Sequence, residues 1–252
     1  MFMKKGGRFM LTVQHVTKKY GKTIACDDVT FTIEDGTTSI LLGPNGAGKS
    51  TILTSVAGLI KHDGAILVGG FGNKTTGARR ILGYIPEIPA LYPNLTVEEH
   101  MEFIARAYGM TDYAQKINNL LERFELSDKK KKFGDQLSKG MQQKLNICLG
   151  LLTDPQVILM DEPMIGLDPH AIKELKTVID ELRNQGKTLF ISTHIIDSVD
   201  MLWDRTIIMQ GGKVMADVAR DELSSRGTSL EDYFFEVTEG VESHLMRGTP
   251  EV

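Results

Sequence analysis

The segment SILLGPNGAGKSTIL, residues 39–53, joins a short apolar run to a glycine-rich loop and then to a stretch with helical spacing. Its centre, Gly43 to Ser50, fits the pattern G-x-x-x-x-G-K-[ST]. Glycines allow successive backbone N–H groups to turn inward around an anion, and the following helix adds its partial positive end. The alternative is an ordinary glycine turn. A predicted strand before the loop and a predicted helix after it favour a phosphate site.

This loop predicts a site for ATP with Mg²⁺. Lys49 is expected to reach the β- and γ-phosphates and to act in catalysis, and the Ser50 hydroxyl to bind the metal. The residues expected to contact the nucleotide here are Gly43, Pro44, Asn45, Gly46, Ala47, Gly48, Lys49, Ser50 and Thr51.

A second motif, VILMDEP, residues 157–163, is an apolar strand that ends in two adjacent acids. Burying a carboxylate costs several kcal/mol unless it is paired or coordinated, so a structural role for both acids is hard to justify. We expect Asp161 to bind Mg²⁺ through water, and Glu162 to orient and deprotonate an attacking water. The alternative is a solvated acid pair at the end of a strand.

His194 follows the next predicted strand of the sheet, TLFIST, residues 188–193. A histidine at a strand end is commonly just a polar loop residue. The carboxyl ends of parallel strands meet at one edge of a sheet, so His194 should face the same ligand as Asp161 and Glu162. Its imidazole is therefore expected to bond the γ-phosphate or the attacking water, and it is a third candidate catalytic residue.

The bulk composition is that of an ordinary globular protein. Among 252 residues, 29 Lys and Arg face 33 Asp and Glu, a net charge of −4, so no basic field predicts a nucleic-acid partner. The two cysteines, Cys26 and Cys148, lie far apart and are expected to be reduced thiols. The sequence contains no apolar run of ~18 residues. The first ten residues lack the apolar core of a secretion signal and are expected to fray.

The pattern along the chain predicts an α/β protein. Val29, Phe31 and Ile33 alternate with polar residues, which is typical of a half-buried strand. Residues 88–150 change to helical spacing, beginning with a capping-box signal at Thr96 and Glu99. Buried strands then alternate with helices, which indicates a parallel sheet. The helical block therefore looks like an insertion into an α/β core.

The stretch LSKGMQQK, residues 137–144, places a Ser-x-Gly at the start of a predicted helix, about 20 residues before VILMDEP. Together with IGLDP at residues 165–169 and STH at 192–194, this combination resembles the nucleotide-binding subunit of ATP-binding cassette (ABC) transporters. The likeness runs from Tyr20 to His194. LSKGM and the tail SLEDYFFEVTEG are most similar to the exporter-type or Ecs-type subgroups.

The resemblance implies one ABC ATPase domain over residues 1–252. It would comprise a P-loop NTPase core with a mainly parallel sheet and an N-terminal antiparallel β subdomain (about 10–87 and 151–222), an inserted α-helical subdomain (about 88–150) and a helical tail (about 223–252). It further implies a separate membrane-spanning transporter subunit as partner, docked on the helical block, and a location at the cytoplasmic face of the membrane.

The resemblance also implies that two subunits, expected to be a homodimer, bind ATP between them head to tail. Tyr20 would stack on adenine, and Asp168 would link the two sites at the interface. Ser138 and the N–H of Gly140 would bind the γ-phosphate held by the partner, since a helix N-terminus attracts anions. The alternatives are a Tyr20 that simply ends a strand and a Ser138 that caps its own helix.

Two departures from the family pattern are visible. The signature usually reads L-S-G-G-Q, whereas here Lys139 and Met141 replace Gly and Gln. Glu87 stands where the family usually has Gln, and as a carboxylate it should bind Mg²⁺. Two other functions compete. A soluble ABC ATPase acting on ribosomes or DNA usually has two cassettes or a long insertion, and a GTPase would need the N/T-K-x-D motif, which GNKTTG lacks.

Overall fold

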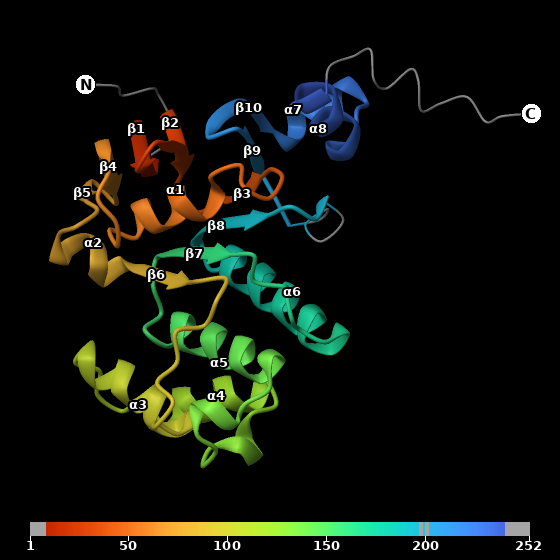
Figure 1. Ribbon diagram of the computed structural model, residues 1–252. Coiled ribbons are helices and arrows are strands. Elements are labelled where there is room, and N and C mark those ends of the chain that lie inside the picture. Colours follow the sequence, from red (N-terminus) through yellow and green to blue (C-terminus); the bar gives the residue numbers. More distant parts are fainter. Residues whose placement is uncertain (1–8, 197–198, 200–201, 240–252) are drawn as a thin grey trace, which may run out of the picture.

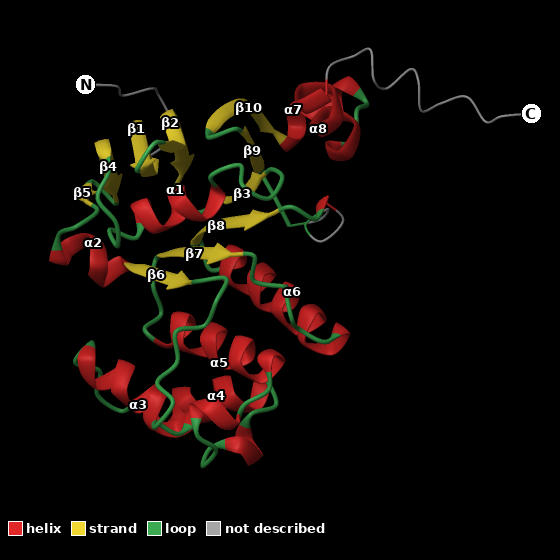
Figure 2. Cartoon of the chain, viewed as in Figure 1, coloured by secondary structure: helices red, strands yellow, loops and turns green. Residues whose placement is uncertain are grey.

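The computed structural model describes residues 9–196, 199 and 202–239 (Figure 1). Two sheets and two groups of helices make up the fold (Figure 2). The smaller sheet is antiparallel and has the order β2-β1-β4-β5. The larger has the order β10-β9-β3-β8-β7-β6 and is parallel except at β10. The strands are β1 Phe9–Tyr20, β2 Thr23–Glu34, β3 Thr38–Leu42, β4 Asp63–Val68, β5 Phe71–Gly72, β6 Leu82–Ile85, β7 Val157–Asp161, β8 Thr188–Thr193, β9 Arg205–Gln210 and β10 Lys213–Ala219.

The helices form two groups around these sheets. Helix α1 lies between the two sheets, α6 lies on the opposite face of the larger sheet, and α3, α4 and α5 form a separate block below it (Figure 1). The helices are α1 Lys49–Val56, α2 Thr76–Ile81, α3 Val97–Ala107, α4 Ala114–Arg123, α5 Lys139–Leu152, α6 Pro169–Asn184, α7 Arg220–Arg226 and α8 Leu230–Glu239. None of the helices in the described residues is both long and apolar enough to cross a lipid bilayer.

The larger sheet is buried on both faces because its strands are continuous apolar runs. Along β3, Ile40 and Leu42 belong to one core cluster with α5 and α6, whereas Leu41 belongs to the other with α1 and the antiparallel sheet. A parallel sheet covered on both faces favours apolar side chains along its strands. All residues of β3 and β7 are buried, including the polar Thr38 and Ser39 at the start of β3 and Asp161 at the end of β7. This sandwich fixes the carboxyl ends of β3, β7 and β8 side by side.

Most of the expected elements are confirmed, and so is the fold class. Thr96 and Glu99 form the predicted capping box of α3. Gly211 and Gly212 join β9 to β10 as a hairpin. Cys26 and Cys148 are free and buried. Helix α2 and the short strand β5 were not predicted, because six and two residues carry too little pattern. The domain boundaries stay predictions, and most of the end predicted to fray lies outside the described residues.

Candidate functional site

The glycine loop has the geometry that its sequence predicts. It connects β3 to α1, and Gly48 at the helix start has φ 101°, a conformation that residues with a Cβ rarely adopt. A Cβ on Gly48 would also lie 2.4 Å from the carbonyl oxygen of Ala25. Lys49 curls back into the loop, and its Nζ donates to the carbonyl of Gly43 at 2.8 Å. The loop is therefore a tight cradle with a buried ammonium inside it.

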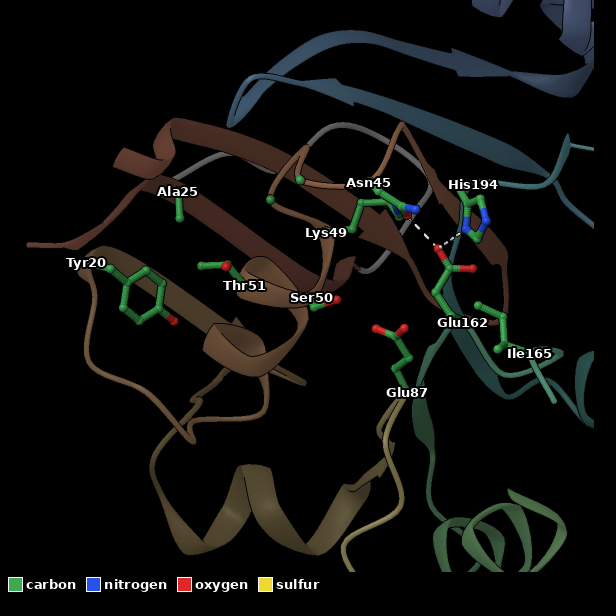
Figure 3. A pocket seen from close by; sticks show the side chains of 12 residues that line it. Tyr20, Ala25, Asn45, Lys49, Ser50, Thr51, Glu87, Glu162, Ile165 and His194 are labelled. Carbon is green, nitrogen blue, oxygen red and sulfur yellow. Dashed lines mark hydrogen bonds and ion pairs between the residues drawn. The ribbon is translucent and has the colours of Figure 1, made fainter. Parts of the chain in front are cut away.

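A cavity of about 490 Å³ opens beside this loop (Figure 3). It gathers residues from β1, the glycine loop, α1 and the loops that follow β6, β7 and β8. Seven of the predicted nucleotide residues, between Tyr20 and Thr51, line it, whereas Gly43, Pro44 and Ala47 of the loop do not. Its lining residues are Tyr20, Ala25, Asn45, Gly46, Gly48, Lys49, Ser50, Thr51, Glu87, Glu162, Ile165 and His194.

Glu162 is the centre of the charged part of the cavity. Its Oε1 lies 3.3 Å from Lys49 Nζ and 2.9 Å from His194 Nδ1, so one oxygen meets both partners (Figure 3). The side chains of Glu162 and Lys49 are each only 6% exposed. The structure thus confirms that the three predicted catalytic residues lie together, and it places His194 on the carboxylate.

The backbone of Glu162 is strained, which the sequence did not indicate. Its φ is 46°, in the left-handed region that costs a residue with a Cβ of order 1–3 kcal/mol. Its N–H is directed at Ser192, whose carbonyl and hydroxyl oxygens lie at 3.2 and 3.1 Å. Such strain persists where the surrounding structure holds it and is concentrated at functional sites. Here it turns the side chain toward Lys49 rather than along the strand direction.

Asp161 is buried beneath the loop and accepts hydrogen bonds from the Ser192 and Ser50 hydroxyls. Burial raises the pKa of Asp161 above its ordinary value, the hydroxyl bonds and Lys49 lower it, and the neighbouring Glu162 raises it further. Ionising a buried carboxylate costs free energy, and a cation next to the carboxylate offsets that cost. The Ser50 hydroxyl and this carboxylate are the hard oxygen donors that Mg²⁺ prefers.

Glu87 and Tyr20 lie at two further sides of the cavity. The carboxylate of Glu87 points into the same space as Ser50 (Figure 3). No cluster of three or more His, Cys, Asp or Glu occurs in the described ranges, but Mg²⁺ needs only one or two carboxylates because it keeps several waters. Tyr20 ends β1 and is 51% exposed, and Lys18 Nζ lies 4.7 Å from the centre of its ring.

Ser138, Gly140 and Asp168 do not line this cavity. Ser138 caps its own helix α5 by accepting from the Met141 N–H at 3.3 Å. The side chain of Ser138 is exposed, and its hydroxyl hydrogen is not used by the cap. Gly140 sits so close to the Gly166 carbonyl that a Cβ would lie 2.9 Å from it.

Asp168 caps α6 and joins it to the helix that carries Ser138. Its side chain accepts from the Ala171 N–H at 2.8 Å, and its second oxygen pairs with Lys144 of α5 at 3.0 Å. Backbone and lysine bonds to the carboxylate lower the pKa of Asp168. Within the chain, Asp168 therefore has a structural role.

Several residues around the site were missed by sequence reasoning. Ser192 bonds both acids, and Gln143 and Asn146 of α5 bond the carbonyls of Pro163 and Pro86, next to Glu162 and Glu87. Ser192 belongs to the STH motif, but the motif by itself does not indicate what its hydroxyl bonds. The only signal for the two amides was a polar residue on an apolar helix face, which does not name its partner.

The comparisons with known proteins agree with this geometry. The family model described as "ABC transporter" matches residues 26–165. The chain is 34% identical over 244 residues to the ABC-type transporter ATP-binding protein EcsA of Bacillus subtilis (strain 168), covering 93% of this chain and 99% of that one.

The chain belongs to the ABC transporter family.

Solved structures support the same assignment. An ATP-binding subunit of an ABC transporter superposes with a TM-score of 0.85 at 35% identity, covering 91% of this chain and 99% of that one. The ATP-binding cassette MJ0796, dimeric and bound to ADP and Pi, has a TM-score of 0.74 at 26% identity over 83% and 98% of the two chains. This ABC protein binds and hydrolyses ATP, and it energises transport by a membrane-spanning partner. The competing role on ribosomes or DNA is not the one for which these relatives are named.

Proposed function

We propose that Glu162 is the general base of ATP hydrolysis, with Lys49 on the β- and γ-phosphates and His194 holding the carboxylate. The observation that carries this proposal is the single Oε1 shared by Lys49 and His194 at the mouth of the phosphate loop. When ATP binds, Lys49 turns to the phosphates and leaves this oxygen free to accept a proton from water. His194 Nδ1 then keeps the carboxylate aimed, as positioning requires in phosphoryl transfer.

The remaining nucleotide contacts follow from the cavity lining. Tyr20 stacks on adenine, and the glycine loop from Gly43 to Thr51 surrounds the phosphates. Ser50, Asp161 and Glu87 would hold Mg²⁺, with Asp161 acting through water. Mg²⁺ would neutralise charge that develops on the transferred phosphoryl group.

The second half of each site is proposed to come from another copy of the chain. Ser138 and Gly140 lie at the N-terminus of α5, outside the cavity that the same chain forms. The exposed hydroxyl and the helix end would bind the partner's γ-phosphate in a head-to-tail homodimer. Asp168 would lie at this interface. The dimeric state of the MJ0796 cassette supports this arrangement.

The membrane-spanning partner is proposed to dock on the helical block. A groove of about 140 Å³ runs between β6, α3 and α5, lined by residues that include Tyr84, Ile104 and Tyr108. Tyr108 in its lining is 49% exposed, and Ile88, next to Glu87, is 79% exposed. Such a patch on a soluble protein marks an interaction surface. Docking there would hold the chain peripherally at the cytoplasmic face of the membrane, in an exporter-type or Ecs-type assembly.

Replacing Glu162 by Gln tests the catalytic assignment. The amide keeps the size of the side chain but cannot take a proton, so turnover should fall about a hundredfold or more while ATP still binds. Nucleotide affinity is measured with a fluorescent ATP analogue, and phosphate release by a coupled assay. Lys49→Ala is the matched control, because it should lose ATP binding itself. Normal turnover in the Glu162→Gln protein would show that Glu162 is not the general base.

A further inference from the structure

Helix α5 carries two buried amide side chains on the face that meets the larger sheet. Gln143 is 2% exposed and Asn146 is 6% exposed. They are three residues apart, so they are neighbours on one side of the helix. Gly140, three residues before Gln143, lies on the same side and packs against the backbone of Gly166. This face therefore contacts the loop after β7 closely at Gly140 and directs the two amides toward the loops after β6 and β7.

The two amides form one chain of hydrogen bonds that joins these loops. Asn146 Nδ2 donates to the Pro86 carbonyl at 2.7 Å and to Gln143 Oε1 at 3.2 Å. Gln143 Nε2 donates to the Pro163 carbonyl at 3.2 Å. Both ends of the chain are proline carbonyls, which only accept, so both amides are locked in one orientation.

The two prolines are the immediate neighbours of the acids at the site. Pro86 precedes Glu87, and Pro163 follows Glu162. Helix α5 thus bonds the backbone next to Glu87, the proposed metal ligand, and the backbone next to Glu162, the proposed base. The same helix begins at Ser138, and Asn146 also lines the groove proposed for the membrane partner. Movement of α5 at either place would reach both acids through the same three hydrogen bonds.

We propose that Asn146 and Gln143 are positioning residues that set the separation of Glu87 and Glu162 and couple both acids to α5. The proposal rests on the proposed roles of Glu87 and Glu162. Burial alone requires only that each amide finds some partner. Here the two partners are the loops with the acids rather than the carbonyls of α5 itself. In the described part of the chain, neither amide forms a hydrogen bond with the phosphate loop, so the loop's own contacts with the phosphates of ATP should be kept.

The test is Asn146→Ala, compared with Cys148→Ala as a matched control. Cys148 is buried two residues further along the same helix, and its Sγ is 3.6 Å from the Leu120 carbonyl, away from both loops. Both variants lose buried contacts, but only the first frees the loop at Pro86. We expect Asn146→Ala to lower kcat about 10- to 100-fold with the KM for ATP unchanged, since displacing a reacting group by about 1 Å can cost that much.

Hydrogen exchange without nucleotide provides a second readout. The amides of Tyr84, Ile85, Glu87 and Ile88 and of residues 164–166 should exchange faster in Asn146→Ala and at the normal rate in Cys148→Ala. Gln143→Ala added to Asn146→Ala should cost less than it does alone, because one chain is already broken. If Asn146→Ala does not fold, Asn146→Ser is used, and the expectations are the same.

Equal kcat and equal exchange in Asn146→Ala and Cys148→Ala would overturn the proposal, and so would fully additive effects of the two amide variants. A wild-type chain that does not hydrolyse ATP would instead contradict the proposed function. The exchange measurement needs no nucleotide, so the two failures are distinguishable.

Discussion

At the residue scale, Asp161 and Glu162 are adjacent and both buried, but the cost of burying their charges is offset in different ways. Glu162 is paired with Lys49 and His194, which offsets the cost of removing its charge from water. Asp161 accepts from two neutral hydroxyls and keeps a raised pKa, caused chiefly by burial. Within the chain, the cost of burying the Asp161 charge is only partly offset, and this suits a residue that binds a cation.

Asp161→Asn should therefore raise the melting temperature of the nucleotide-free protein at pH 7 while abolishing hydrolysis. The native pKa lies above the unfolded value of about 3.9, so the folded chain binds this proton more tightly. The free energy of unfolding thus falls as pH rises between those two values. The gain in the variant should be about 2–4 °C for each kcal/mol relieved.

Thermal unfolding of both proteins at pH 7 and near pH 4 checks this. The difference should shrink as the pH falls, because Asp161 becomes protonated first in the folded and then in the unfolded chain. A variant less stable than wild type at pH 7 would contradict the assignment of an uncompensated charge.

Glu87→Gln should change basal ATP turnover by no more than about tenfold, or ~1.4 kcal/mol. An amide oxygen can still bind Mg²⁺, and the variant removes one negative charge near the γ-phosphate. Steady-state hydrolysis across a Mg²⁺ titration measures the effect. Complete loss of activity would show that the carboxylate itself is essential.

At the element scale, helix α5 connects an exposed N-terminus to the two loops that carry Glu87 and Glu162. Its N-terminal cap, Ser138, is exposed. Lys144, in the middle of the helix, forms ion pairs with Asp168 and Glu125. The buried face of the helix bonds the two loops that carry Glu87 and Glu162. Lys144 is 9% exposed at the side chain, and its ion pairs with Asp168 and Glu125 raise its pKa against the effect of burial. The helix is therefore held rigidly against the loops after β6 and β7.

Ser138→Asp separates the capping role from the proposed contact with the partner's phosphate. Aspartate caps a helix as well as serine does, and its charge is favourable at a helix N-terminus, so the melting temperature should stay the same or rise. The same charge would repel the partner's γ-phosphate, so turnover should fall about a hundredfold.

Ser138→Ala is the matched control for that variant. It should lose about 1 kcal/mol of stability with the cap but keep more activity than the aspartate variant. Thermal unfolding and phosphate release are measured on both proteins. Full turnover in Ser138→Asp would mean that Ser138 serves only its own helix.

At the scale of the whole molecule, the larger sheet separates two hydrophobic cores. One core joins the antiparallel sheet and α1, and the other joins α6 and the helical block. The cavity is lined by the glycine loop after β3 and by the loops after β6, β7 and β8, at the carboxyl edge of the sheet. The chain's own α5 N-terminus does not line the cavity, and in the proposed shared site a second copy would supply one.

Turnover per chain should therefore rise with protein concentration and then level off. Glu162→Gln should form a dimer when ATP is added and remain monomeric without it, because nucleotide joins the two surfaces. Size-exclusion chromatography with light scattering gives the mass in each state. A chain that remains monomeric while hydrolysing ATP at the full rate would refute the shared site.

The sequence by itself determined the features encoded by neighbouring residues. The phosphate loop, the acid pair after β7 and the capped starts of α3 and α5 depend on residues within about eight positions of one another, so their local chemistry is readable directly. The buried runs of β3, β7 and β8 likewise indicated a parallel sheet, which brings His194 to Glu162.

Only the tertiary structure decided how these pieces act on one another. The left-handed backbone of Glu162 is held by Ser192, 30 residues away, and the bond from Asn146 to Pro86 spans 60 residues. No local pattern selects such partners, because a buried amide or hydroxyl requires a hydrogen bond but not a particular one. Pairing of β7 with β8 places Ser192 beside Glu162, and packing of α5 against the loop after β6 places Asn146 beside Pro86.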